Sequence, residues 1–180
     1  EREAARLRHI ELTLIEATER TPDARSFHSL GVFYLTQQKL SKAVEAFERS
    51  LKIDAKNAQT LNDLGSAYFE KAKAEAADMR FKTLSTALEN FSKSVNLDAK
   101  FPAALFNRSL CMQELRLNNE ARESWQQYLA LDPSSAWANE ARKNLEKLEQ
   151  NSVGSKTKED AVAEVVAASK TNDEAAAWNI

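Results

Sequence analysis

The chain has 180 residues, of which 43% are hydrophobic and 29% charged, a balance typical of a folded globular protein and not of a disordered one. It contains only three Gly and three Pro, which disfavours all-β and doubly wound folds because their many turns use these residues. The net charge is −2 and there is no basic block, which argues against nucleic-acid binding. A single cysteine excludes an internal disulfide, and no apolar stretch is long enough to span a bilayer.

The first predicted element is a helix over residues 1–20. Its apolar residues recur at helical spacing on one face: Leu7, Ile10, Leu14 and Ala17. The chain begins at Glu1, without Met, inside this helix, and we expect it to be a fragment of a longer protein. We expect residues 1–22 to be a flanking helix that covers the apolar surface of the next unit.

Residues 24–57 are predicted to form two helices joined by a short turn. The first helix carries small and apolar residues on one face: Phe27, Leu30, Gly31 and Tyr34. The second carries a similar stripe: Ala43, Phe47 and Leu51. A glycine inside a helix costs about 1 kcal/mol relative to alanine, so Gly31 indicates that a neighbouring helix packs against the backbone there. We expect Ala43 to supply the matching small contact.

Residues 58–101 repeat this pattern. The matching positions are Leu61, Leu64, Gly65, Tyr68, Ala87, Phe91 and Val95. Tyr68, however, lies 19 positions before Ala87, whereas Tyr34 lies 9 positions before Ala43. This copy therefore contains an insertion of ten residues, within 70–80, made of strong helix formers. We expect the insertion to lengthen both helices of the pair, so that they project.

Residues 102–135 form a third, looser copy. Its matching positions are Leu105, Ser109, Met112, Ala121, Trp125 and Leu129. The three prolines lie near the starts of predicted first helices: Pro22, Pro102 and Pro133. Thr21 and Asp132 are the expected N-caps of two of these helices.

The last predicted elements follow the third copy. Residues 136–149 form an expected capping helix whose stripe resembles the first half of a fourth copy: Trp137, Ala141, Leu145 and Leu148. Residues 150–180 read as a linker, with Gly154 as a helix stop, followed by a truncated helical segment.

Three copies in register resemble the tetratricopeptide repeat (TPR), most closely in residues 24–57, where an aromatic residue replaces the usual Trp. The resemblance implies an all-α array of helical hairpins, a TPR superhelix of about three repeats over residues 24–149 with flanking helices at both ends. A plain helical bundle with coincidental stripes is the alternative, and the three copies in register count against it.

A finer resemblance concerns the third copy. The stretches 101–108, 120–133 and 137–142, together with the lengthened second copy, look like the TPR region that precedes a caspase-like CHAT protease domain in bacterial multidomain proteins. That resemblance implies a regulatory or sensing domain of a larger bacterial enzyme. The catalytic His and Cys of such proteins would lie in a C-terminal domain outside this chain, so no catalytic residue carries over.

Few residues could support catalysis. Cys111 could be paired with His28 or His9 as nucleophile and base, but it lies in an apolar stretch of a predicted first helix, where a free cysteine is usually a small buried hydrophobe. The two His and one Cys have no metal-binding spacing, and the three Gly are too isolated for a phosphate loop. We therefore expect no enzymatic activity, no cofactor and no metal.

The first helices of stacked pairs should form a concave wall, and the positions beside the packing stripe would face a partner. The candidate groove residues are Arg25, His28, Val32, Leu35, Asn62, Ser66, Phe69, Phe106, Leu110 and Gln113. Apolar residues on this wall indicate either a partner site or a surface covered by the chain's own terminal helices. In chaperone-binding TPRs a cluster of Lys, Asn and Arg clamps a carboxylate. The corresponding positions here are His28, Val32, Asp63, Ala103 and Asn107, which almost lack cations.

The expected function is a cytoplasmic protein-interaction scaffold that binds a peptide or helix in the groove, without nucleic acid or membrane as partner. Two alternatives stay open: the regulatory domain implied by the CHAT resemblance, and self-association into a homo-oligomer through the repeat ends.

Overall fold

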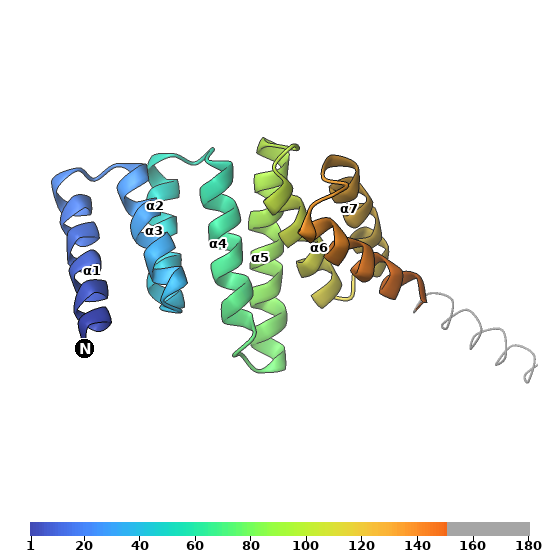
Figure 1. Cartoon of the computed structure of the whole chain (residues 1–180), viewed down its shortest axis with the longest axis horizontal. Helices are drawn as coiled ribbons and strands as arrows, with labels where there is room; N and C mark the ends of the chain where they lie inside the picture. Colours follow the sequence, from blue (N-terminus) through green and yellow to red (C-terminus); the bar gives the residue numbers. More distant parts are fainter. Residues whose placement is uncertain (151–180) are drawn as a thin grey trace, which may run out of the picture.

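A computed structural model of the chain describes residues 1–150, which contain helices and no strand. The helices are α1 (Arg2–Arg20), α2 (Ala24–Thr36), α3 (Leu40–Ile53), α4 (Ala58–Ala72), α5 (Ala77–Leu97), α6 (Pro102–Glu114) and α7 (Asn118–Leu131), followed by a helix over residues 136–150, here called the C-terminal helix. In Figure 1 the helices follow one another in chain order along the long axis, with α2 and α3 overlapping in this view, and the C-terminal helix crosses the end of the row. The all-α prediction is confirmed. The predicted linker and truncated segment lie outside the described residues.

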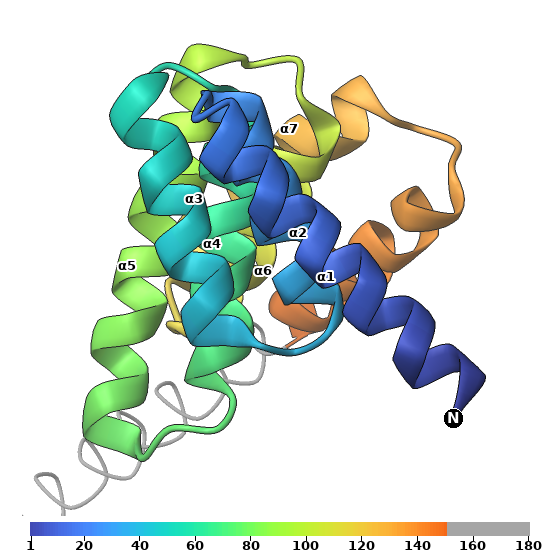
Figure 2. The same cartoon turned by 90° about the vertical axis from the view of Figure 1, so that its left-hand side faces the viewer.

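Consecutive helices form antiparallel hairpins: α2 packs along α3, α4 along α5 and α6 along α7. Each second helix also packs against the first helix of the next hairpin, α3 against α4 and α5 against α6. The first helices touch one another directly, α2 with α4 and α4 with α6, so they form one continuous wall. In the view along the stack, α3 and α5 lie on the left of this wall (Figure 2).

Aromatic rings on the second helices determine how closely the helices of the first two hairpins pack. A Cβ atom placed on Gly31 would lie 2.6 Å from the Phe47 ring, and one on Gly65 would lie 2.7 Å from the Phe91 ring. The two glycines are therefore required for close helix contact, as predicted. The expected partner was wrong, because the residue that meets Gly31 is Phe47 and not Ala43. Side chains point toward the N-terminus of their helix, which places the ring one turn back, over the glycine.

Two of the expected helix caps are also wrong. The N-cap of α2 is Asp23, whose carboxylate accepts from the Ser26 N–H at 2.7 Å, and not Thr21. At the C-terminal helix, the Ser135 hydroxyl accepts from the Ala138 N–H at 3.1 Å, while Asp132 accepts from the Ser135 N–H one turn earlier. Pro102 is the first residue of α6, as its fixed φ favours.

The inserted residues lengthen the second hairpin unequally. Helix α5 has 21 residues, against 14 in both α3 and α7, while α4 has 15 against 13 in α2 and α6. The turn between α4 and α5 projects beyond the other turns (Figure 1). The prediction that the insertion would lengthen both helices and make them project is confirmed, but most of the added helical length is in α5.

Helix α1 lies against α2 and has no fully buried residue. Its Leu14 and Ile15 pack on the core of the first hairpin, and Glu11 accepts from the Lys39 ammonium at 2.7 Å. Within residues 1–150, no helix is both long enough and apolar enough to cross a membrane.

Candidate binding groove

A hollow of about 530 Å³ lies between α6 and the C-terminal helix, on the wall formed by the first helices. We call it the C-terminal groove. It is lined by Phe101, Pro102, Ala103, Phe106, Asn107, Leu110, Tyr128, Asp132, Trp137 and Glu140. Most of these side chains are apolar or aromatic, as in pockets that bind an apolar part of a ligand.

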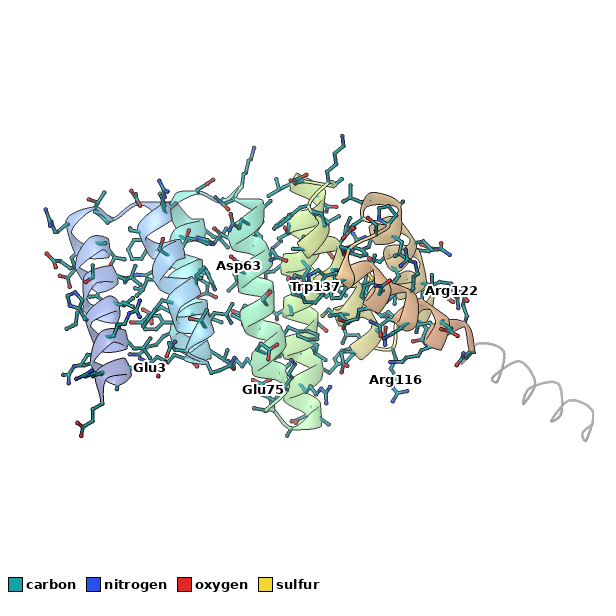
Figure 3. The ribbon with its side chains drawn as sticks, viewed as in Figure 1. Glu3, Asp63, Glu75, Arg116, Arg122 and Trp137 are labelled. Atoms are coloured by element: carbon teal, nitrogen blue, oxygen red, sulfur yellow. The ribbon has the colours of Figure 1, made fainter. Side chains whose placement is uncertain are left out.

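A cluster of four aromatic rings centred on Phe106 lies beneath and beside the C-terminal groove. Phe106 packs edge-to-face against Trp125, Tyr128 and Trp137, with ring centroids 5.0, 5.3 and 5.1 Å apart. Only 6% of the surface of Phe106 is accessible to solvent, compared with 60% for Trp137. Phe106 therefore supports the groove from below, and Trp137, labelled in Figure 3, forms its exposed edge.

The charged residues of the C-terminal groove are acidic. A hydrogen bond from the Ser135 hydroxyl, with a second from the Tyr128 hydroxyl, holds the pKa of Asp132 below its ordinary value. Glu140 is exposed and forms no ion pair with another residue of the described part of the chain. No Lys, Arg or His of residues 1–150 lines this groove.

A smaller hollow of about 170 Å³ lies on the wall between α4 and α6. We call it the central hollow. Its lining is Ser66, Phe69, Glu70, Lys73, Phe91, Asn107 and Leu110. The two hollows share Asn107 and Leu110, so together they form one continuous surface over the second and third hairpins. Lys73 pairs with Glu70 at 2.7 Å, which leaves the central hollow without net charge.

A chain of polar contacts crosses the wall between the first helices. The His28 ring Nε2 lies 2.9 Å from the Asp63 carboxylate, and the Asn62 amide donates to the same carboxylate at 3.1 Å. The Asn107 amide donates to the Asn62 oxygen at 2.9 Å and to the Ser66 hydroxyl at 3.5 Å. We call this set the polar ladder. It joins α2, α4 and α6 across the face that carries the hollows.

Residues 24–57 match a family model described as "Tetratricopeptide repeat". A tetratricopeptide repeat protein from Parabacteroides merdae superposes on this chain with a TM-score of 0.68 at 22% identity, covering 83% of this chain and 56% of that one. A TPR protein of Thermus thermophilus gives a TM-score of 0.65 at 19% identity, covering 83% and 76%. The fold is a TPR superhelix.

Two further TPR structures of similar shape were solved with bound peptides. The first TPR of Spaghetti (RPAP3), bound to the HSP90 peptide SRMEEVD, has a TM-score of 0.61 at 22% identity and covers 74% of this chain and 98% of that one. The second TPR domain of human RPAP3, in complex with the HSP70 peptide SGPTIEEVD, has a TM-score of 0.58 at 21% identity, with coverage of 70% and 94%.

In sequence, the chain is 28% identical over 136 residues to the Homo sapiens "Protein O-mannosyl-transferase TMTC3". This match covers 73% of the chain but only 14% of the human protein.

Only some of the predicted groove residues line the two hollows of the TPR wall. Ser66, Phe69 and Leu110 line the central hollow, and Leu110 and Phe106 line the C-terminal groove. Phe106 is nevertheless almost fully buried, so its prediction as an exposed anchor is corrected. Asn62 is likewise 5% exposed and engaged in the polar ladder, so it is not available to orient a partner.

The remaining predicted residues lie apart from both hollows. Arg25 and Val32 are exposed on α2, His28 contacts Asp63, and Leu35 packs on the core of the first hairpin. Gln113 accepts from the Trp125 indole N–H at 3.3 Å and lines a separate depression near the α6–α7 turn. None of these five lines the two hollows of the TPR wall.

Sequence reasoning missed the contribution of the C-terminal helix. It was interpreted as a cap, although its resemblance to a fourth first helix already indicated that it would continue the TPR wall. Trp137, an indole on the stripe of that helix, was the signal that could have identified the groove rim. Asp132 and Glu140 gave no comparable signal because acidic residues are common on helix surfaces.

Cys111 does not have the environment of a nucleophile. It is completely buried, its Sγ donates to the Leu84 carbonyl at 3.3 Å, and burial raises its pKa to about 12. A thiol with such a pKa is protonated at neutral pH, whereas reactive cysteines are thiolates. The described residues also contain no group of three or more His, Cys, Asp or Glu placed to hold a metal.

Proposed function

We propose that this TPR chain is a non-enzymatic protein-interaction module that holds a peptide or a partner helix along the central hollow and the C-terminal groove. The observation that carries the proposal is the continuous, mainly apolar surface over the second and third hairpins. Such a surface on a folded chain usually marks a partner site. Two TPR structures of the same fold hold peptides, which supports a peptide as the partner.

The anchors in this proposal are the half-buried and exposed apolar side chains of the wall. Phe69 and Leu110 present surface to the central hollow, and Trp137 presents its indole at the rim of the C-terminal groove. Aromatic side chains in concave sites contribute a large share of binding energy in protein interfaces. Phe106 acts indirectly, because its ring holds Trp137 in place.

The peptide should differ from the acidic chaperone tails in the two peptide-bound relatives. The wall positions expected for a carboxylate clamp hold His28, Val32, Asp63, Ala103 and Asn107. Asp63 is itself a carboxylate, which would repel an acidic tail, and the Asn107 amide donates to Asn62, so neither residue offers a donor to a carboxylate. A different class of peptide is therefore proposed.

The proposal can be tested by selecting phage-displayed random peptides on the 180-residue chain and on two matched variants. Ala103 is exposed at the N-terminal end of α6 and lines the C-terminal groove, so Ala103→Gln fills the groove without disturbing the core. Ala130 is exposed on α7 and lines neither hollow, so Ala130→Gln is the control. We expect selected peptides to bind Ala103→Gln about tenfold more weakly, and Ala130→Gln as tightly as the parent.

Peptides that bind all three proteins equally, or a selection that yields no binder, would show that the groove is not the site. The melting temperature of each variant should be unchanged, which separates a lost contact from a lost fold. Sedimentation of the parent chain and of Ala103→Gln tests self-association, because a dimer formed through the groove would dissociate in the variant.

Cytoplasmic location, bacterial origin and a regulatory role beside a CHAT protease domain stay predictions. A single, buried thiol suits a reducing compartment.

A further inference from the structure

The charged residues that line the C-terminal groove all have the same sign. Asp132 and Glu140 are its only charged lining residues among positions 1–150, and both are acidic. Glu140 follows Trp137 by three positions on the same helix, so the carboxylate and the exposed indole share one face. Asp132 lies where α7 ends, and as a carboxylate whose pKa is lowered by hydrogen bonds it is negatively charged at neutral pH.

Nearby guanidinium groups do not neutralise the groove. Arg108 lies on α6 but its side chain donates to Ser124 and to Gln127 at 2.8 Å, on α7. Arg142 lies on the C-terminal helix and donates to Asn139 and to the Pro133 carbonyl. Both cations are directed to groups that do not line the C-terminal groove.

Apolar walls strengthen the field of these two carboxylates. A cleft lined by charge of one sign, with walls of low dielectric constant, concentrates the potential inside it and attracts the opposite charge. The adjoining central hollow adds no net charge, because Glu70 and Lys73 pair with each other. The negative potential is therefore confined to the end of the wall where the exposed indole lies.

We infer that the C-terminal groove selects a peptide in which a large apolar side chain is next to a lysine or arginine. This inference rests on the proposed function, since it names the chemistry of the peptide that the groove would hold. The apolar side chain lies against Leu110, and the neighbouring cation lies against Glu140 and the Trp137 indole. An indole face attracts a cation in addition to the carboxylate. A peptide with an acidic residue at the same place meets two like charges and is rejected.

The same random-peptide selection tests the charge preference, with Glu140→Lys and Glu123→Lys as a matched pair. Glu123 is exposed on α7 and lines neither hollow, so its variant makes the same change of charge outside the groove. On the parent chain and on Glu123→Lys, we expect enrichment of Lys or Arg beside an apolar residue. On Glu140→Lys, this enrichment should disappear and acidic residues should replace it.

Binding constants of the most enriched basic peptide give a second readout. At about 50 mM salt, where screening is modest, Glu140→Gln should weaken binding about threefold and Glu140→Lys about tenfold, with Glu123→Lys unchanged. Selected peptides without a basic preference, or equal binding to Glu140→Lys, would overturn the inference. If such peptides still lost affinity for Ala103→Gln, the proposed function would stand while its charge selectivity failed. Peptides that bind Ala103→Gln as tightly as the parent, or a selection that yields no binder, would overturn both the proposed function and the charge selectivity.

Discussion

At the scale of single residues, contacts between a glycine and a ring determine the distance between the two helices of a hairpin. The rings of Phe47 and Phe91 are almost fully buried and lie against Gly31 and Gly65. In the third hairpin Ser109 takes the place of the glycine, and its hydroxyl donates to the Ser124 hydroxyl at 2.7 Å. The first two hairpins thus depend on a backbone contact that the third replaces with a buried hydrogen bond.

Gly31→Ala should lower the free energy of unfolding by about 1–3 kcal/mol, because the added methyl group overlaps the Phe47 ring and overpacks the core. The loss should be smaller when Phe47→Leu is already present, since the ring that causes the overlap is gone. Urea unfolding of the parent, the two single variants and the double variant measures this coupling. Equal losses in both backgrounds would show that Phe47 does not limit the space at Gly31.

At the scale of elements, the turns of the first and third hairpins share a strained residue. Gln38 and Arg116 have φ of 55° and 59°, the left-handed region that favours glycine. In each turn the next residue donates back across the end of the helix, Lys39 to the Tyr34 carbonyl and Leu117 to the Met112 carbonyl, both at 2.9 Å. This is the Schellman geometry, in which glycine is the usual residue.

Gln38→Gly should therefore stabilise the chain by about 0.5–1 kcal/mol, because relief of the left-handed strain exceeds the added entropy of the unfolded chain. Gln37→Gly is the matched control: Gln37 has φ of −90°, and glycine there should destabilise by about the same amount. Thermal unfolding of both variants measures the difference. A lower melting temperature for Gln38→Gly would mean that its side chain contributes more than its strain costs.

The helices and their pairing could be predicted from the sequence more completely than the candidate site could. Apolar stripes with helical spacing predicted the helices and their pairing, because each stripe must be buried against a neighbour. The projection of the insertion followed from the 19 positions between Tyr68 and Ala87. The burial of Phe106 did not follow, because it depends on how the C-terminal helix crosses α6 and brings Trp137 against its ring. That crossing is a property of the stacked array and not of any single stripe.

At the scale of the whole molecule, stability should vary along the row of helices. Each hairpin contacts only its neighbours, and α1, at one end, is attached by partly exposed contacts. In such arrays local opening is governed by the nearest interfaces. The ion pairs of Glu11 with Lys39 and Lys42 are part of the interface between α1 and the first hairpin.

Protonation of Glu11 should loosen α1 without affecting the other end of the row. The hydrogen bond from Lys39 lowers the pKa of Glu11 from its ordinary value of 4.5, so its contribution is present above pH 4.5 and is lost as pH falls through the lower value of the folded chain. Hydrogen exchange should show faster opening of α1 and α2 in Glu11→Gln than in the parent at about pH 7, and this difference should shrink as the pH is lowered through the acidic range. Protection of α6 and α7 should be the same in both proteins. A difference that stays the same at every pH would assign the effect to packing instead of charge.

The polar ladder limits how the main chain of a partner can be recognised. The side chains of the polar ladder hydrogen-bond to one another across the middle of the wall, which leaves fewer of their donors and acceptors for an incoming main chain. Side chains held by such hydrogen bonds should need little reorganisation on binding, so that the entropy lost on association falls mainly on the peptide. Discrimination between sequences would then depend on the shape and charge of individual side chains at the two hollows, spaced along a backbone that is itself recognised only loosely.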